Sequence, residues 1–244
     1  MEILIRNAPG FQQETRKRYS AGTEEAMSLP QKYARRIRQV LGLRAVWQPG
    51  AIIDLGDIVT LRRGIFVPIE ALSDFGVSFR RKRGKQAELT LNSQGVSETL
   101  FQAGKQVGDI SGLKPNAKAQ LEIKFERGNA YYLRTPKLNS VAMDNLAAVG
   151  RAVAKLPDWD FGRNYVVWKV LQAKQFTFIG SRQKIRRIAF SGSGKALARL
   201  LTTGVSAGIT KTSSRKLDLE IIGQGGSIAI GVTRIRRDGK LRDV

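Results

Sequence analysis

The stretch "NYVVWKVLQAKQFTFIG", residues 164–180, is the part of this sequence that most constrains the fold. It is rich in valine and aromatic residues, which favour strands, and its length predicts one long strand. Val166 and Val170 point to one face of that strand, and Val167 and Leu171 point to the other. Both faces are therefore apolar, and each needs cover, either from protein (a sheet core on one side, a helix or loop on the other) or from lipid.

Two lysines interrupt the apolar pattern of this strand. Lys169 lies on the face of Val167, and Lys174 lies on the face of Trp168. A lysine that faces lipid at the middle of a bilayer costs about 2–4 kcal/mol. If the strand crossed a membrane, Lys169 would suit a water-filled lumen, and Lys174 would have to lie near an interface or at a bend.

Alternation of apolar and polar residues recurs on both sides of this strand. It is unbroken in "AKAQLEIKFE" (117–126), and "QAELTLN" (86–92) and "RKLDLEIIG" (215–223) behave likewise. Either a half-buried antiparallel sheet or a membrane-spanning strand gives this pattern. Helices predicted at 97–110 and 193–201 lie between such strands, which gives two strand–helix–strand units. The other predicted elements are helices at 30–42 and 139–156, strands at 44–47, 56–63, 65–70, 184–190 and 227–237, and a hairpin turn at 223–227.

The charge balance of the chain points to a polyanionic partner. The 244 residues include 42 Lys and Arg against 20 Asp and Glu, a formal net charge of +22. Such a chain is drawn to nucleic acid or to an anionic membrane surface. It has no cysteine and no histidine, which excludes disulfides, thiolate chemistry, imidazole bases and acylation of a cysteine.

The sequence offers no pattern of catalytic residues. "FSGSGKAL" (190–197) lacks two features of a phosphate-binding loop, because Ala189 stands where its first glycine belongs and Ala196 where its Ser or Thr belongs. The acidic residues are scattered, without a cluster that would hold a metal ion. We therefore expect no enzyme, no catalytic residue, no metal and no cofactor.

Three stretches resemble the gasdermin pore-forming domain, in particular its compact bacterial and fungal relatives. "NYVVWKVLQAKQFTF" is similar to the family's long strand with a valine–leucine core, and "KLDLEIIGQGGSIAIGVTRI" is similar to its strand–turn–strand ending. "LGLRAVWQPGAIIDLGDIVTLRRGIFVPIEALSDF" is similar to its opening helix, strand and hairpin. The resemblance covers about residues 33–237 in the order of elements.

The resemblance implies an α+β fold, with a twisted antiparallel or mixed central sheet and flanking helices, which converts to a transmembrane β-barrel on oligomerisation. It implies a pore-forming protein that binds anionic lipid, oligomerises and inserts two β-hairpins per subunit, from residues 78–126 and 164–222. The pore would permeabilise membranes and cause cell death, in an immune or defence role. Before activation by a protease or regulatory partner, the chain would be a cytoplasmic soluble monomer or a partner-inhibited complex; afterwards it would be an oligomer in the cell membrane.

This interpretation assigns roles to basic and apolar residues. Trp47 would anchor at the membrane interface, which tryptophan favours, although a core position would suit it equally. The residues expected to hold lipid headgroups are Arg35, Arg36, Arg38, Arg80, Arg81, Lys82, Arg83, Lys85, Arg186 and Arg187. The residues expected to enter the membrane are Leu89, Leu91, Leu100, Phe101, Ala119, Leu121, Ile123, Phe125, Val166, Trp168, Val170, Phe176, Phe178, Leu197, Leu200, Leu201, Val205, Ile209, Leu217 and Leu219.

The domain organisation follows from the same interpretation. Residues 1–30 would be an extra N-terminal arm, 31–237 the pore-forming domain and 238–244 a short tail. The competing hypothesis is a basic nucleic-acid-binding protein, supported by the charge and by "RRKRGK" and "RQKIRR", with Phe79 and Trp168 as stacking residues. Nucleic acid is not the partner that we expect, because no known nucleic-acid motif accompanies these residues.

Overall fold

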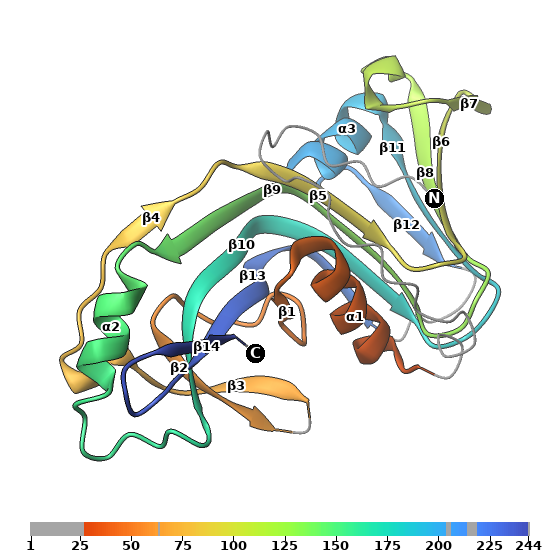
Figure 1. The fold of residues 1–244 in the computed structure, drawn as a ribbon. Helices are drawn as coiled ribbons and strands as arrows, with labels where there is room; N and C mark the ends of the chain where they lie inside the picture. Colours follow the sequence, from red (N-terminus) through yellow and green to blue (C-terminus); the bar gives the residue numbers. More distant parts are fainter. Residues whose placement is uncertain (1–26, 63, 204–205, 214–218, 244) are drawn as a thin grey trace. The chain divides into compact units, whose positions relative to one another are not determined.

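The computed structural model describes residues 27–62, 64–203, 206–213 and 219–243, and antiparallel strands dominate it (Figure 1). The predicted α+β fold with antiparallel sheets is thus confirmed. The described helices are α1 (Leu29–Leu41), α2 (Leu146–Val153) and α3 (Gly194–Thr203), with short 3-10 helices η2 (Leu72–Phe75) and η3 (Ile110–Gly112). The described strands are β1 (Arg44–Ala45), β2 (Asp57–Arg62), β3 (Ile65–Ala71), β4 (Arg81–Arg83), β5 (Ala87–Asn92), β6 (Val96–Gln102), β7 (Lys105–Val107), β8 (Lys118–Phe125), β9 (Ala130–Met143), β10 (Asn164–Ser181), β11 (Arg186–Ser193), β12 (Thr210–Ser213), β13 (Leu219–Ile235) and β14 (Leu241–Asp243).

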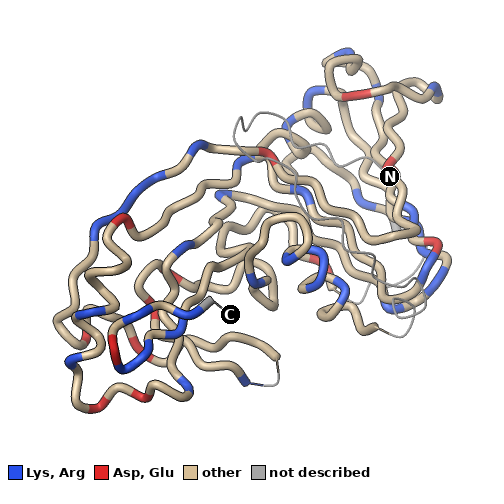
Figure 2. The backbone as a smooth tube through the Cα atoms, in the orientation of Figure 1, with Lys and Arg blue, Asp and Glu red and all other residues tan. Residues whose placement is uncertain are grey.

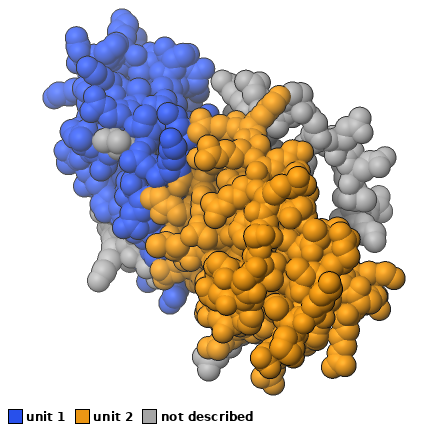
Figure 3. Space-filling model, turned by 90° about the vertical axis from the view of Figure 1, so that its left-hand side faces the viewer, with its two compact units in different colours: residues 1–36, 87–138, 174–224 blue, residues 37–86, 139–173, 225–244 orange. Residues whose placement is uncertain are grey.

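The chain divides into two compact units, coloured separately in Figure 3. The long strands β9, β10 and β13 each contribute residues to both units. The predicted arm at 1–30 lies almost wholly outside the described residues, and a single domain over 31–237 stays a prediction. Unit 1 takes its described residues from 27–36, 87–138 and 174–224, and unit 2 takes its own from 37–86, 139–173 and 225–243.

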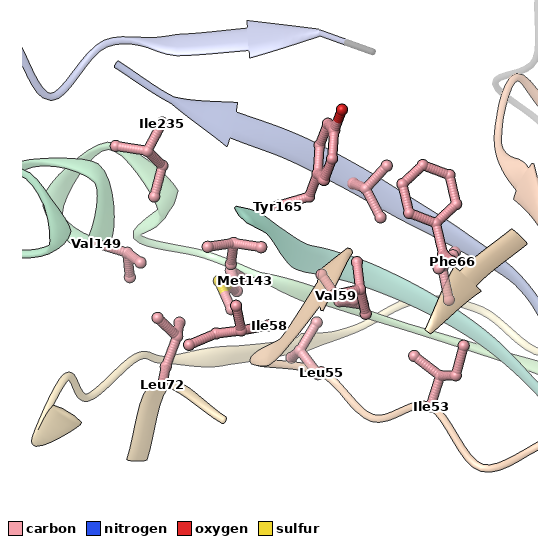
Figure 4. Close-up of a cluster of buried hydrophobic side chains, with 14 of the residues drawn as sticks. Ile53, Leu55, Ile58, Val59, Phe66, Leu72, Met143, Val149, Tyr165 and Ile235 are labelled. Atoms are coloured by element: carbon pink, nitrogen blue, oxygen red, sulfur yellow. The ribbon is translucent and has the colours of Figure 1, made fainter. Parts of the chain in front are cut away.

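Unit 2 is an antiparallel arrangement of strands around an apolar core. The first residues of β10 pair with β2, β2 pairs with β3, and β1 and β14 pair with β13. Ile58 and Val59 of β2 are fully buried in this core. Figure 4 shows Ile58 beside Met143 of β9, with Val149 of α2 packed in the same cluster.

Unit 1 contains a five-stranded antiparallel sheet in the order β12-β11-β8-β6-β7. The central strand, β8, pairs with β11 on one side and with β6 on the other. Helix α3 packs on β8 and β11 through Leu197, Leu200 and Leu201, which are all buried. Ser193 caps the start of this helix, since its Oγ accepts from the Ala196 N–H at 3.2 Å.

Strand β10 has cover from protein on both faces. Val166 and Val170 on one face are 0% and 1% exposed, and Val167 on the other is 0% exposed. Lys169 is half-buried and Lys174 is exposed at the surface. The two apolar faces that the sequence shows are therefore both satisfied in this fold.

The helix predicted at 97–110 is wrong. These residues form β6, β7 and the start of η3, and Leu100 of β6 pairs with Val107 of β7. Ala103 and Gly104 connect the two strands with φ values of 48° and 80°. Two successive left-handed residues make the turn that matches the twist of a two-residue hairpin. The first predicted unit therefore contains no α-helix, whereas the second contains α3 as predicted.

The helix predicted at 139–156 is confirmed only in its second half, as α2. Residues up to Met143 continue β9 and pair with β4, with Ala142 opposite Lys82. At the end of this ladder, the Asp144 N–H donates to the Arg80 carbonyl at 2.9 Å. A strand forms here because pairing with β4 satisfies the backbone polar groups.

The hairpin turn predicted at 223–227 is also wrong, because these residues lie within β13. Ser227 accepts from the Gly50 N–H at 3.0 Å and donates its own N–H to the Ala51 carbonyl at 3.3 Å. A Cβ added to Gly226 would lie 2.2 Å from the Gly50 carbonyl oxygen. The glycines thus serve a close approach between two backbone segments, and the strand continues through them.

Candidate functional site

Unit 1 holds most of the residues expected to enter a membrane, and six of them lie in its five-stranded sheet. On β8, Ala119, Leu121, Ile123 and Phe125 share one face and are all at most 5% exposed. The other predicted residues that are buried are Leu89, Leu91, Leu100, Val166, Val170, Phe176, Phe178, Leu197, Leu200 and Leu201, and those that are half-buried are Phe101, Trp168, Ile209 and Leu219. Val205 and Leu217 lie outside the described residues.

The opposite face of the same sheet carries an ion-pair cluster centred on Glu122. Its side chain is 2% exposed and lies 3.1 Å from the ammonium of Lys124, and it also pairs with the guanidinium of Arg187 on β11. Strand β8 is thus apolar on one face and charged on the other. Membrane-spanning hairpins need this division, with one face toward lipid and the other toward water.

A second ionic cluster in unit 1 ties together four elements around Arg134 of β9. Its guanidinium contacts Glu88 of β5 at 2.9 Å and Glu98 of β6 at 3.2 Å. Its Nε donates to the Leu201 carbonyl of α3 at 3.3 Å. The Tyr132 hydroxyl donates to Glu98 at 3.1 Å, so Glu98 is held from two sides.

The electrostatics of this cluster keep Arg134 charged. Burial lowers the pKa of Arg134, but the neighbouring Tyr132, Glu98 and Glu88 raise it more, and the net pKa is raised. Burial, and then the charge of Glu98, raise the pKa of the Tyr132 hydroxyl well above its ordinary value. The cluster is therefore a charged clamp between β5, β6, β9 and α3.

Sequence reasoning missed this clamp because β9 was not predicted. The signal was present in "AYYLRTP" (130–136), where aromatic and β-branched residues favour a strand. The partners Glu88 and Glu98 gave no signal of their own, because the sequence does not say which strands become neighbours.

Turns connect the two segments that form the five-stranded sheet to the neighbouring strands. Residues 93–95 connect β5 to β6, residues 126–129 connect β8 to β9, and residues 182–185 connect β10 to β11. Each of these turns contains one residue in the left-handed region, with φ values of 77° at Gly95, 52° at Asn129 and 54° at Ile185. Isoleucine is disfavoured there, because its branched Cβ crowds the backbone. Opening that turn into an extended strand would relieve the strain.

The basic stretch at 80–85 forms an exposed ridge on unit 2. Figure 2 shows it as a run of basic residues along β4. Arg80 pairs loosely with Asp144 at 3.6 Å, and the Arg81 guanidinium lies 5.7 Å from the centre of the Phe79 ring. The members of this ridge, Arg80, Arg81, Lys82, Arg83 and Lys85, are all exposed, as a surface for headgroups requires.

The remaining predicted headgroup residues are less accessible. Arg35 and Arg36 of α1 are half-buried, and Arg38 is exposed. Arg186 is only 6% exposed, and Arg187 takes part in the Glu122 cluster. The predicted anchor, Trp47, is half-buried just after β1. Among these residues, Arg38 and Arg187 thus resemble the β4 ridge in their exposure, but Arg187 is already paired with Glu122.

The described residues lack two other kinds of site. They contain no helix that is both long and apolar enough to span a membrane. Nor do the described acidic residues form a group of three or more that could hold a metal ion.

Comparison with known proteins finds likeness in structure only. No protein-family model and no curated protein matches the chain. A bacterial gasdermin from Bradyrhizobium tropiciagri is similar at 14% identity and a TM-score of 0.38, over 87% of this chain and 90% of that one. The gasdermin A3 membrane pore is similar at 11% identity and a TM-score of 0.37, over 89% and 94%. Both of these solved structures are gasdermins, the family that the sequence resembles. Because identity and TM-score are both low, the case for a function has to come from this chain's own residues.

Proposed function

We propose that this chain is a membrane pore former of the gasdermin type. It binds anionic lipid through exposed basic residues, oligomerises, and inserts two hairpins per subunit, one from each half of the unit 1 sheet. The observation that carries the proposal is the construction of this sheet. Its strands come from two segments that each depart from long strands through turns, and its central strand separates apolar from charged residues.

The lengths of the segments suit a membrane. If the turn at 93–95 opened, β5 and β6 would form one strand over residues 87–102. At ~3.3 Å per residue such a strand would measure about 50 Å, which exceeds the ~30 Å hydrocarbon core.

Opening requires that the closed contacts break. The Arg134 clamp joins β6 of the first segment to α3 of the second, so separation of either segment breaks it. We propose that lipid contact, a protease or a regulatory partner supplies the trigger. On this proposal the inactive chain resides in the cytoplasm and the active oligomer in the cell membrane, where permeabilisation causes cell death in a defence role.

The nucleic-acid alternative loses support from the positions of its key residues. Trp168 packs against Gly231, where an added Cβ would lie 2.8 Å from the indole ring. Phe79 lies next to Arg81, and Arg186 of "RQKIRR" is buried. These side chains do not form an open platform for stacked bases.

Dye release from liposomes tests the proposal. Purified chain, intact and after trimming of either end, is added to vesicles of phosphatidylcholine alone or mixed with phosphatidylserine or cardiolipin. Release from the anionic vesicles and retention in the neutral ones is the expected result. If every form left the anionic vesicles sealed at micromolar protein, the proposal would be wrong. A gel shift with DNA and RNA at physiological salt is the control, and only weak, sequence-independent retention is expected.

A further inference from the structure

We propose that a groove beside the β13–β14 hairpin of unit 2 binds a phosphate monoester, carried by a lipid headgroup or by a small soluble molecule. None of the basic residues assigned above belongs to this site. The groove has a volume of about 720 Å³. It is lined by Phe161, Arg234, Ile235, Arg236, Arg237, Asp238, Leu241 and Arg242.

The charges in the groove are unbalanced. Four of its lining residues are arginines, and Asp238 is the one carboxylate among them. That carboxylate already pairs with Arg236 at 3.7 Å and with Lys240 at 3.8 Å. Figure 2 shows the hairpin as basic residues around a single acidic segment. A ligand with two negative charges would supply the missing counter-charge.

The pairing of strands β13 and β14 adds to this excess of positive charge. Arg234 of β13 lies directly opposite Arg242 of β14 in the antiparallel ladder. Like charges in this position destabilise a sheet unless another group neutralises them. Among the described side chains, no carboxylate forms an ion pair with Arg234, Arg237 or Arg242. The pairing of two arginines therefore points to an external anion.

Aromatic side chains hold the guanidinium groups in place. Arg234 donates to the Tyr165 hydroxyl and lies 4.7 Å from the centre of that ring. Arg237 lies 5.8 Å from the centre of the Phe161 ring. A guanidinium that is already oriented loses less side-chain freedom when it binds phosphate, and its planar N–H fork matches two phosphate oxygens. This arrangement favours a phosphate over a diffuse polyanion.

The hairpin that frames the groove is itself well defined. Its turn is closed by Arg236 N–H donating to the Lys240 carbonyl and by Gly239 N–H donating to the Arg236 carbonyl, both at 2.9 Å. Gly239 has a φ of 75°, and a Cβ there would lie 3.2 Å from the Cα of Arg151 on α2. The turn thus rests on α2, which fixes the positions of the basic side chains around it.

Calorimetric titration with inorganic phosphate and glycerol 3-phosphate tests the soluble ligand. Flotation with phosphatidylcholine vesicles that contain either phosphatidic acid, a monoester, or phosphatidylglycerol, a diester, tests the lipid source. We expect saturable binding to at least one monoester probe, and stronger flotation with phosphatidic acid than with phosphatidylglycerol if the source is lipid. Binding to phosphate with no preference between the vesicles assigns a soluble ligand, and this also supports the site.

Paired variants with the same change in charge separate this site from the general charge of the chain. The double variant Arg237→Gln/Arg242→Gln should weaken monoester binding at least tenfold. The control, Arg62→Gln/Lys155→Gln, removes two exposed basic residues of unit 2 that do not line the groove and should bind within about twofold of the native chain. Circular dichroism must show that both variants keep the native fold. Equal losses in the two variants, or no saturable binding by the native chain, would overturn the proposal. Neither readout requires a pore, so the outcome is independent of dye release.

Discussion

Replacement of Arg134 by methionine should destabilise unit 1 by about 3 kcal/mol. Methionine keeps much of the side chain's length and removes its charge and donors. The bond to Glu98 joins side chains that are 15% and 23% exposed, and a hydrogen bond to a charged group contributes about 1.5–3 kcal/mol. The bond to the Leu201 carbonyl adds about 0.5–1.5 kcal/mol. The pair with Glu88, which is 40% exposed, adds about 1 kcal/mol at most, because solvent screens it.

Thermal unfolding followed by circular dichroism measures this effect. For a chain of this size, 3 kcal/mol corresponds to a fall in the melting temperature of about 6–12 °C. The matched control is Arg163→Met, which breaks an ion pair whose partners are 85% and 50% exposed, and its cost should stay below about 1 kcal/mol. A double-mutant cycle with Glu98→Gln should give a coupling of about 1–2 kcal/mol. A melting temperature for Arg134→Met equal to that of the control would refute the reasoning. Since the clamp joins both hairpin segments, the same variant should also release dye faster than the native chain.

Three further changes have defined expected outcomes. Gly226→Ala should cost more than about 1 kcal/mol of unfolding free energy in a urea titration, because its φ of 144° and the Gly50 carbonyl leave no room for a Cβ; an unchanged midpoint would contradict the close approach. The raised pKa of Tyr132 means that the folded chain keeps a proton that the unfolded chain loses above pH ~10, so stability is full below that pH and falls above it. Tyr132→Phe should flatten that decline in melting temperature, and an equally steep decline would count against it. Arg81→Glu/Arg83→Glu should weaken flotation with phosphatidylserine vesicles by about 30-fold or more, since each basic residue contributes ~1 kcal/mol near an anionic surface; retention of native binding would remove the β4 ridge from the account.

The sequence predicted the elements whose own pattern is strong. Strand β10 was predicted within a residue at each end, because it is rich in β-branched and aromatic residues and contains no proline and no glycine before Gly180. Helix α1 was recognisable from Pro30 at its start and Gly42 after its end. The alternation in β8 predicted which of its faces would be buried, and Leu121 and Ile123 lie on that face.

The errors arose where tertiary pairing decides the structure. The apolar residues of the stretch at 97–110, such as Leu100 and Phe101, are compatible with either a helix or a strand. The left-handed turn at Ala103 makes this stretch a hairpin. The glycines of β13 looked like a turn, and only the approach of residue 50 explains them.

The features of the candidate site likewise include some that the sequence predicts and some that it does not. The β4 ridge is visible in the sequence as a run of basic residues. The Arg134 clamp and the paired arginines of the β13–β14 hairpin, in contrast, depend on strand register. Register brings together residues that are 36 and 46 positions apart in the clamp. No local pattern in the sequence carries that information.

Single-cysteine scanning along β8 tests the central claim, the insertion of this sheet into a membrane, most directly. The chain has no cysteine, so each introduced thiol is the only one, and each is labelled with an environment-sensitive fluorophore. After incubation with anionic vesicles, labels at 119, 121 and 123 should be quenched by nitroxide lipids, and labels at 118, 120 and 124 should be quenched by iodide in the water. A period of two in lipid quenching, absent before vesicles are added, is the result that the account predicts. Labels at odd and even positions that stay equally protected from nitroxide lipids, while the vesicles leak, would contradict it.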